Sequence, residues 1–290
     1  MIDTHIHIDG EEFKEDLAEV VQRAKDAGCE MMFVPAINLE SLTTVPEVCS
    51  QYPGFMFPMM GLHPEDVKED WQEVLEKMRQ ELRNTKHLTL NTKSDYNGEE
   101  GDTTLQPQNL TTSKPQSYIA IGEVGLDYYW SREFEKEQLL AFEEQVKWSV
   151  EMQLPLMIHC RKAQNEMVKI LRKYKDKLPG GVFHCFTGNA HEAEELLEFE
   201  NFVLGIGGVL TFKKSNLPET LKEAVPLSRI VLETDAPYMA PVPMRGKRNE
   251  SSYIIYIKEK LAEIYGTTAD EVDRITTETA KRVFAKRLIP

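Results

Sequence analysis

The first candidate for chemistry is a pair of histidines near the start of the chain. His5 and His7 stand two positions apart in a short, β-rich segment. Because successive side chains of a strand point to opposite faces, both imidazoles would share one face, as would Asp3. Two imidazoles placed in this way can bind one metal ion. A solvated or structural histidine pair is the alternative, and the pair alone does not decide between the two.

Four further potential ligands follow short apolar segments elsewhere in the chain. They are Glu123, His159, His184 and Asp235. Each stands at the carboxyl end of a segment that is typical of a buried strand. If these strands belong to one closed barrel, their carboxyl ends meet at one rim and the side chains converge. We therefore expect a single metal centre built from the two histidines and these four residues.

The elements that must position these residues alternate between strand and helix along the chain. The expected strands cover 2–8, 31–35, 55–60, 119–122, 156–158, 182–184, 202–206 and 230–232, and the expected helices cover 13–27, 42–49, 71–83, 135–152, 163–174, 192–199, 217–224, 252–265 and 269–286. Eight such units in about 250 residues fit a closed (β/α)8 TIM barrel in a single domain. An open doubly wound sheet is the alternative, but the sequence has no dinucleotide or P-loop fingerprint.

Six ligands are more than the three or four that one zinc ion commonly takes. They are enough for two divalent ions about 3.5–4 Å apart, which can hold and ionise a shared water. Glu123 comes from the middle strand of the set and is the expected bridge. Imidazoles suit Zn²⁺, Mn²⁺ or Fe²⁺, while the carboxylates leave Mg²⁺ open, so the residues do not identify the metal. By formal charge, such a centre can accept one phosphodiester without net repulsion.

Other polar side chains at the same rim are candidates for binding substrate. His63 ends the third strand, and Arg161 follows the fifth and could hold a phosphate oxygen bidentately. A basic loop with Arg245, Lys247 and Arg248 follows the eighth strand and is the clearest local positive patch. The alternatives are a packing role for His63, a surface salt bridge for Arg161 and a merely solvated loop.

Aromatic and thiol side chains stand close to the ligand positions. Tyr128, Tyr129 and Trp130 follow the Glu123 strand, where they could stack a nucleobase or pack under a loop. Cys160 and Cys185 each follow a ligand histidine directly. In a strand they would point to the opposite face, so we expect them to pack outside the barrel interior rather than act as nucleophiles.

Composition limits the class of protein. The 290 residues are 41% hydrophobic and 28% charged, as in ordinary globular proteins, and no apolar run approaches the ~18 residues of a membrane span. The N-terminus lacks the features of a secretory signal, and the four cysteines have no C-x-x-C spacing. We expect a cytoplasmic protein without an obligate protein partner. The net charge of −14 argues against general adhesion to nucleic acid but not against a local site.

One segment, 85–117, interrupts the alternation between the third helix and the fourth strand. Of its 33 residues only five are apolar and seven are threonine, so it cannot bury much surface. We expect a mobile surface insert. Connections from helix to strand open at the end of a barrel away from the catalytic rim, so the insert is not expected to be an active-site lid.

Taken together, the motifs resemble those of the TatD family of metal-dependent deoxyribonucleases. They are Asp3-Thr4-His5-Ile6-His7, Gly122-Glu123-Val124-Gly125-Leu126-Asp127, His159-Cys160-Arg161, Phe183-His184-Cys185-Phe186-Thr187-Gly188, Glu233-Thr234-Asp235-Ala236-Pro237-Tyr238 and Arg245-Gly246-Lys247-Arg248-Asn249-Glu250. The resemblance implies a TIM-barrel hydrolase of the amidohydrolase-like superfamily with a pair of divalent metals. It implies DNA as substrate, generally degraded 3′ to 5′ as a single strand. It also implies that His5, His7, Glu123, His159, His184 and Asp235 are the metal ligands.

The leading hypothesis is therefore hydrolysis of a phosphodiester in DNA. Glu123 and Asp235 are the expected catalytic residues, with Asp235 orienting the attacking water and accepting its proton. An amidohydrolase, a lactonase or a hydrolase of small phosphoesters could use the same metal centre. A non-catalytic metal-binding protein is the third possibility.

Overall fold

Eight parallel strands run side by side in chain order, β1 to β8. The computed structural model describes residues 1–91 and 117–288. The strands are β1 (Ile2–Asp3), β2 (Met31–Ala36), β3 (Met56–Met60), β4 (Ile121–Asp127), β5 (Leu156–Arg161), β6 (Gly181–Phe183), β7 (Phe202–Ile206) and β8 (Ile230–Leu232). Most of their residues are buried, as expected for a parallel sheet that is covered on both faces.

The first and last strands close the ring. The Thr4 backbone N–H donates to the Leu232 carbonyl at 3.0 Å, and Ile6 forms a parallel bridge with Ala236. The prediction of a (β/α)8 barrel is confirmed. The predicted first strand, 2–8, is too long. Regular pairing ends at Asp3, after which the backbone of Ile6 bonds to β2 while that of His7 bonds beyond β8.

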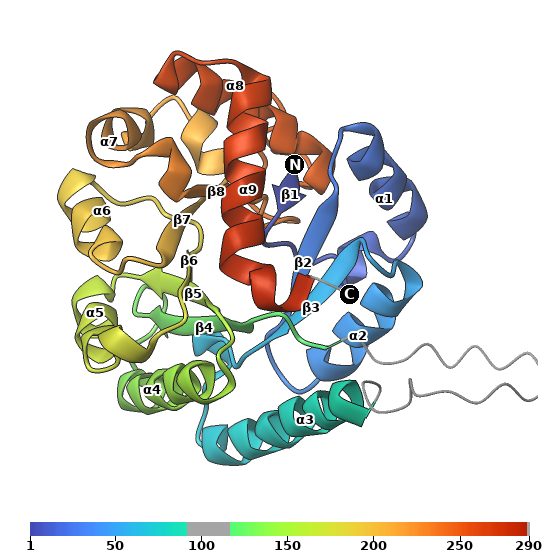
Figure 1. Cartoon of the computed structure of the whole chain (residues 1–290), viewed down its shortest axis with the longest axis vertical. Coiled ribbons are helices and arrows are strands. Elements are labelled where there is room, and N and C mark those ends of the chain that lie inside the picture. Colours follow the sequence, from blue (N-terminus) through green and yellow to red (C-terminus); the bar gives the residue numbers. More distant parts are fainter. Residues whose placement is uncertain (92–116, 289–290) are drawn as a thin grey trace, which may run out of the picture.

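Helices surround the ring of strands (Figure 1). They are α1 (Leu17–Asp26), α2 (Ser41–Gln51), α3 (Trp71–Asn91), α4 (Glu135–Met152), α5 (Gln164–Arg172), α6 (Ala190–Leu197), α7 (Leu217–Ala224), α8 (Ile254–Tyr265) and α9 (Ala269–Leu288). Each of the shorter helices buries one stripe; in α1 this is Val20, Val21 and Ala24, spaced to fall on one face. The predicted helix 13–27 starts later, at Leu17, because 11–13 form a separate 3₁₀ turn.

The last helix closes one end of the barrel. Ala280 and Phe284 of α9 are buried in a cluster with Ile2, Phe33 and Ile119, which lie at or near the amino ends of strands. Figure 1 looks onto this end, with α9 crossing in front of the strands. The barrel therefore has an amino-terminal end filled by apolar side chains, and its carboxyl end is left for the polar residues.

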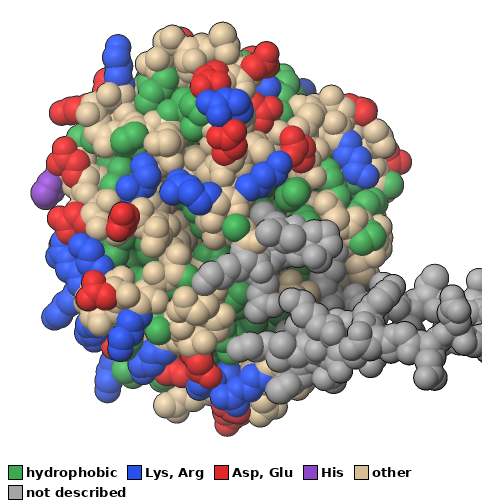
Figure 2. Space-filling model, in the orientation of Figure 1, with side chains coloured by type: hydrophobic (Ala, Val, Ile, Leu, Met, Phe, Trp, Pro, Cys, Tyr) green, Lys and Arg blue, Asp and Glu red, His purple; other side chains and the backbone are tan. Residues whose placement is uncertain are grey.

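The predicted insert, 85–117, begins too early, because α3 continues to Asn91. Residues 92–116 lie outside the described residues. On the face seen in Figure 2, acidic and basic side chains are interspersed over the described surface. Among the described helices, none is both long and apolar enough to cross a bilayer.

Candidate metal centre

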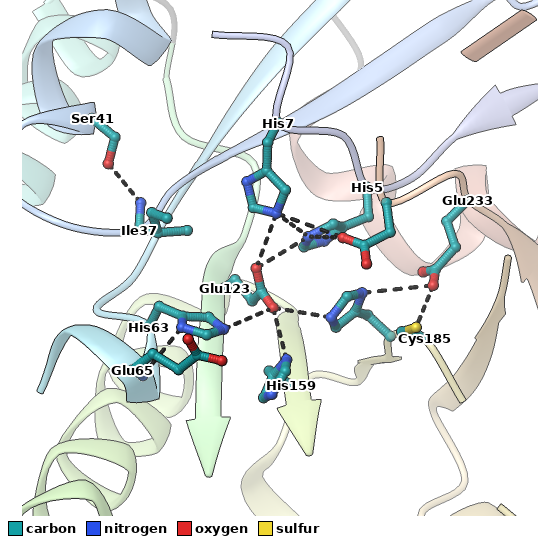
Figure 3. A network of polar contacts seen from close by, with 12 residues as sticks. His5, His7, Ile37, Ser41, His63, Glu65, Glu123, His159, Cys185 and Glu233 are labelled. Atoms are coloured by element: carbon teal, nitrogen blue, oxygen red, sulfur yellow. Dashed lines mark hydrogen bonds and ion pairs between the residues drawn. The ribbon is translucent and has the colours of Figure 1, made fainter. Parts of the chain in front are cut away.

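The carboxylate of Glu123 lies at the middle of the polar cluster (Figure 3). Its Oε2 atom is 3.1 Å from Nε2 of His5 and 3.5 Å from Nε2 of His7. Its Oε1 atom is 2.9 Å from Nε2 of His184 and 3.1 Å from Nδ1 of His159. The two oxygens of one buried carboxylate thus face two different pairs of imidazoles, which is the arrangement of a bridging ligand.

Asp235 completes the group around His5 and His7. Its Oδ1 atom lies 3.8 Å from Nε2 of His5 and 3.7 Å from Nε2 of His7. The residue stands three positions beyond β8 with a left-handed φ of 55°, and its backbone N–H donates to the His5 carbonyl at 2.9 Å. Asp can adopt this conformation more readily than most residues. The bond to His5 holds the carboxylate beside the first strand.

The structure brings all six predicted ligands together, but their places relative to the strand ends need correction. Glu123 does not end its strand but lies inside β4, which continues to Asp127. Pairing between β4 and β5 shifts register between Ile121 and Val124, and Glu123 lies within this irregularity. His159 is likewise inside β5, whereas His184 directly follows β6. Residues that follow apolar runs in the sequence therefore do lie together in the structure, although the predicted ends of the strands differ from the observed ones.

His63 is also part of the cluster, with Nε2 3.3 Å from Oε1 of Glu123. Geometry alone would admit it as a ligand, since it forms a possible metal-binding group with Glu123 and His159. However, its Nδ1 atom accepts a hydrogen bond from the Glu65 backbone N–H at 3.2 Å. A neutral imidazole that accepts at Nδ1 carries its proton on Nε2. His63 therefore presents an N–H donor to the centre and not a lone pair.

Two buried carboxylates face the outer ring nitrogens of two histidines. This role was not predicted from the sequence for either residue. Asp127 Oδ2 lies 2.9 Å from Nε2 of His159 and can accept a hydrogen bond from it. When the ring proton is on Nε2, the lone pair of Nδ1 faces Glu123. Glu233 Oε1 lies 3.6 Å from Nδ1 of His184 and accepts the Cys185 N–H at 2.5 Å. The available signal was that both acids stand within four residues of a predicted ligand.

The donor set fits divalent cations. Five imidazoles face one carboxylate, and Nε2 of His5 and Nε2 of His7 lie only 3.2 Å apart. His5 and His184 face Glu123 with Nε2, and their outer, buried Nδ1 atoms have no hydrogen-bond partner among the described residues. Because a neutral imidazole offers only one lone pair and one proton, hydrogen bonds within the cluster leave atoms unsatisfied. Cations between the converging lone pairs would satisfy the ring nitrogens that face inward.

Burial and the charges of neighbouring side chains together set the protonation of the cluster. Burial, helped by the neighbouring imidazoles, lowers the pKa of His5 to about 4 and that of His7 to about 3. Burial would raise the pKa of Glu123, but the surrounding histidines outweigh it and hold that pKa well below its ordinary value. Burial raises the pKa of Asp235 to about 7. At neutral pH the cluster thus offers two neutral imidazoles, an ionised bridge and a carboxyl group able to exchange a proton.

The residues predicted to bind substrate differ in their surroundings. The guanidinium of Arg161 lies 3.6 Å from the ring centre of Tyr129, and that of Arg245 lies 4.0 Å from the ring centre of Phe212. Lys247 lines an open pocket beside the loop. Arg248 is engaged within the protein, because it makes a bidentate pair with Asp16 at 2.7 and 2.8 Å. The structure therefore gives Arg248 a role in holding the loop.

The two cysteines beside the ligand histidines behave differently. Cys160 packs against the main apolar core, as predicted. Cys185 does not lie in a strand as predicted, because β6 ends at Phe183 and Cys185 takes a left-handed φ of 49° in the following turn. Burial raises the pKa of the Cys185 thiol, and the carboxylates of Asp235 and Glu233 add to the effect. The thiol therefore stays protonated and is a poor nucleophile.

Fold and site together define a class. Histidines and carboxylates at the carboxyl end of a parallel eight-stranded barrel, arranged around one central carboxylate, are typical of metal-dependent TIM-barrel hydrolases.

Comparison with known proteins narrows the class to a family. The model of the "TatD related DNase" family matches residues 2–285, and the chain belongs to this family. It is 34% identical to the uncharacterized metal-dependent hydrolase YabD of Bacillus subtilis, with 98% of each chain covered. It is 29% identical to the 3′-5′ ssDNA/RNA exonuclease TatD of Pectobacterium carotovorum, over 98% of this chain and 99% of that protein. The crystal structure of the TatD homologue YJJV from Escherichia coli superimposes with a TM-score of 0.82, at 25% identity and 98% coverage of both chains.

Proposed function

We propose that this hydrolase is a deoxyribonuclease that removes nucleotides from the 3′ end of single-stranded DNA. The observation that carries the proposal is the placement of Glu123, whose two oxygens face separate histidine groups. Similarity to a 3′-5′ ssDNA/RNA exonuclease over almost the whole chain supports the substrate class. We also propose that residues 1–290 act as one domain, since β1 and β8 close a single ring.

We assign two divalent ions to the cluster. His5, His7 and Asp235 would hold one ion. His159 and His184, which both face Oε1 of Glu123, would hold the other, and Glu123 would bridge the two. The predominance of imidazole favours Zn²⁺ or Mn²⁺ over Mg²⁺.

When bound, such ions activate water and neutralise charge that develops on phosphoryl oxygens. The side chains supply the rest. Asp235, whose pKa burial raises to about 7, accepts the proton that the attacking water loses at neutral pH. His63 donates from Nε2 to a phosphoryl oxygen, since its Nδ1 atom is held by the Glu65 N–H. Arg161, Arg245 and Lys247 position neighbouring phosphates, while Arg248 keeps the basic loop in place.

The test uses Asp235→Asn, with the exposed Asp176→Asn as its matched control. Both proteins are checked for folding by circular dichroism and for metal content, then given single-stranded DNA labelled at the 5′ or the 3′ end. We expect D235N to lose at least 100-fold in turnover, by analogy with other general bases, and D176N to match the parent. Full cleavage by folded, metal-loaded D235N would remove Asp235 from the mechanism.

The same assay examines polarity and substrate class. A 3′-terminal phosphorothioate cap should block degradation, and a 5′ cap should not. Single-stranded RNA, a lactone and a small phosphomonoester complete the panel. Turnover of the lactone or the phosphomonoester in preference to DNA would contradict the proposal.

A further inference from the structure

Two aromatic side chains are exposed next to the metal centre. The chain leaves β4 at Asp127 and continues through Tyr128, Tyr129 and Trp130. Tyr128 is buried in the main core, but Tyr129 is 49% and Trp130 70% exposed. The hypothesis of packing under a loop therefore holds for the first of the three residues and fails for the other two. Aromatic rings of this size left in water side by side suggest a surface used for binding.

The two rings and one arginine form a single structure, which we call the aromatic rim (Tyr129, Trp130 and Arg161). The rings meet edge to face at 4.8 Å, and the Arg161 guanidinium lies 3.6 Å from the centre of Tyr129 and 5.4 Å from that of Trp130. Among the described residues Arg161 makes no salt bridge, and the nearby Asp127 carboxylate, whose pKa it helps to lower, is engaged by His159 and the Tyr129 N–H. A guanidinium stacked in this way keeps N–H groups at its edge free for an anion.

The aromatic rim is fixed to the metal centre by a short chain of contacts. The Tyr129 backbone N–H donates to Oδ1 of Asp127 at 2.8 Å, and Oδ2 of the same carboxylate lies 2.9 Å from Nε2 of His159. The other ring nitrogen of His159 faces Glu123 at 3.1 Å. One carboxylate thus joins the backbone beneath the rings to a proposed metal ligand. A group stacked on the rim is held at a fixed place relative to the reacting phosphate.

We propose that the aromatic rim is a subsite that stacks an unpaired base of the nucleic-acid strand, with Arg161 binding a phosphate beside it. Every base has a flat face that can stack on Trp or Tyr, and this recognition is independent of sequence. A base in a duplex is already stacked and paired, so the rim favours single strands. The inference rests on the proposed nuclease function and deepens it, because it assigns residues that select the form of the substrate.

Variants of the rim test the inference against a matched change elsewhere. Trp130→Ala and Tyr129→Ala are compared with Leu140→Ala on the outer helix α4, which is 46% exposed. Stacking contributes about 1–3 kcal/mol per base, so each rim variant should lose about 5- to 150-fold in kcat/KM on single-stranded DNA. The loss should appear mainly in KM. Leu140→Ala should match the parent, and Trp130→Phe should recover most of the loss.

A second substrate separates stacking from any other role of these residues. An oligonucleotide with abasic sites at its 3′-terminal two positions keeps the phosphates but has no base to stack. Its cleavage should be the same for the parent and Trp130→Ala. Equal losses on intact and abasic strands, or no loss on the intact strand, would overturn the inference.

A measurement of binding without turnover distinguishes a failure of the stacking inference from a failure of the nuclease proposal. Trp130 is one of three tryptophans, so a phosphorothioate oligonucleotide should quench fluorescence of the metal-loaded protein, and Trp130→Phe should lose that part of the quenching. If DNA is not cleaved but quenching through Trp130 remains, the nuclease proposal fails and the stacking site stands. If DNA is cleaved without such quenching, the stacking site fails alone.

Discussion

At the residue scale, a histidine can bind a metal only if an unprotonated ring nitrogen faces the centre of the cluster. His159 and His63 are both within 3.3 Å of the same oxygen of Glu123, yet their outer contacts set them apart. Asp127 accepts from the outer nitrogen of His159, whereas a backbone N–H donates to the outer nitrogen of His63. The first contact leaves a lone pair facing inward and the second leaves a proton. This contrast separates a ligand from a hydrogen-bond donor where distance alone does not.

The proposed bridging role of Glu123 predicts different metal losses in two isosteric variants. Glu123→Gln should weaken both ions, because both halves of the cluster face its oxygens. Asp235→Asn should weaken only the ion beside His5 and His7. Metal content after dialysis, measured by mass spectrometry, gives the stoichiometry. Retention of one full equivalent by Glu123→Gln would show that Glu123 serves a single ion.

Glu233 predicts a smaller effect on a single ligand. Its carboxylate faces Nδ1 of His184 at 3.6 Å and also accepts from a backbone N–H. Glu233→Gln keeps an acceptor for the backbone but removes the charge, so metal affinity should fall about 10- to 100-fold without loss of fold. Competition with a chromophoric chelator measures the affinity. An unchanged affinity would limit Glu233 to a structural role.

The sequence predicted which six residues cluster and missed the acids that support them, for a physical reason. Glu123 and His184 follow apolar runs, and runs of that kind can be recognised from neighbouring residues alone. The role of Glu233 depends on where β8 lies against the turn after β6, which is a relation between distant segments. The position of Cys185 depended on a left-handed turn that no glycine marks. Local sequence patterns predict the strands and the residues that follow them, but not the contacts between segments that are far apart in the sequence.

At the scale of elements, the basic loop after β8 is attached to α1 by two ion pairs, in which only the Glu250 side chain is buried. Arg23 pairs with Glu250 at 2.6 Å, and Arg248 pairs with Asp16. Burial alone would raise the pKa of Glu250, but hydrogen bonds from Arg23 and Ser252 outweigh it and hold that pKa below the ordinary 4.5. These two ion pairs fix the loop that carries Arg245 and Lys247 against α1.

Glu250 therefore makes stability depend on pH. A lowered pKa gives stability that is fully present above about pH 4.5 and is lost as the pH falls through the folded-state value. Glu250→Gln should lower the free energy of unfolding by about 1–3 kcal/mol at pH 7. The difference from the parent should shrink below pH 4.5. Urea unfolding at several pH values measures it, with the exposed Glu259→Gln as control, and a difference independent of pH would contradict the assignment.

A substitution in the closing helix α9 should lower stability without lowering catalytic activity. The sequence indicated a helix at 269–286 but not its place, because its apolar face would suit any neighbouring surface. Phe284 is fully buried at the amino end of the barrel. Phe284→Ala should cost about 3–5 kcal/mol, whereas turnover per folded molecule should stay near that of the parent. Thermal unfolding and kcat at 25 °C measure both, and a selective loss of kcat would show coupling between the two ends.

At the scale of the whole molecule, the barrel separates stability from chemistry. Apolar side chains fill its amino end. The proposed ligands cluster on the carboxyl side, where the chain leaves β4 for the aromatic rim and β8 for the basic loop. A net charge of −14 would repel a polyanion at long range. Substrate attraction must therefore be local, from bound cations and from arginines that are not already paired. Arg161 fits that requirement and Arg248 does not.

This division predicts the effect of removing the polar segment 92–116. Its described flanks are the end of α3 and the residues before β4, and Ile119 there packs with Phe284 of α9 at the amino end. Replacing the 25 residues by a flexible Gly/Ser linker should leave kcat/KM on single-stranded DNA within about twofold, since Ile119 beside the segment packs at the amino end of the barrel. Circular dichroism and metal content establish that the shortened protein is intact. A large loss of turnover in that intact protein would mean that the segment reaches the opposite end of the barrel, and the separation of the two ends would then be incomplete.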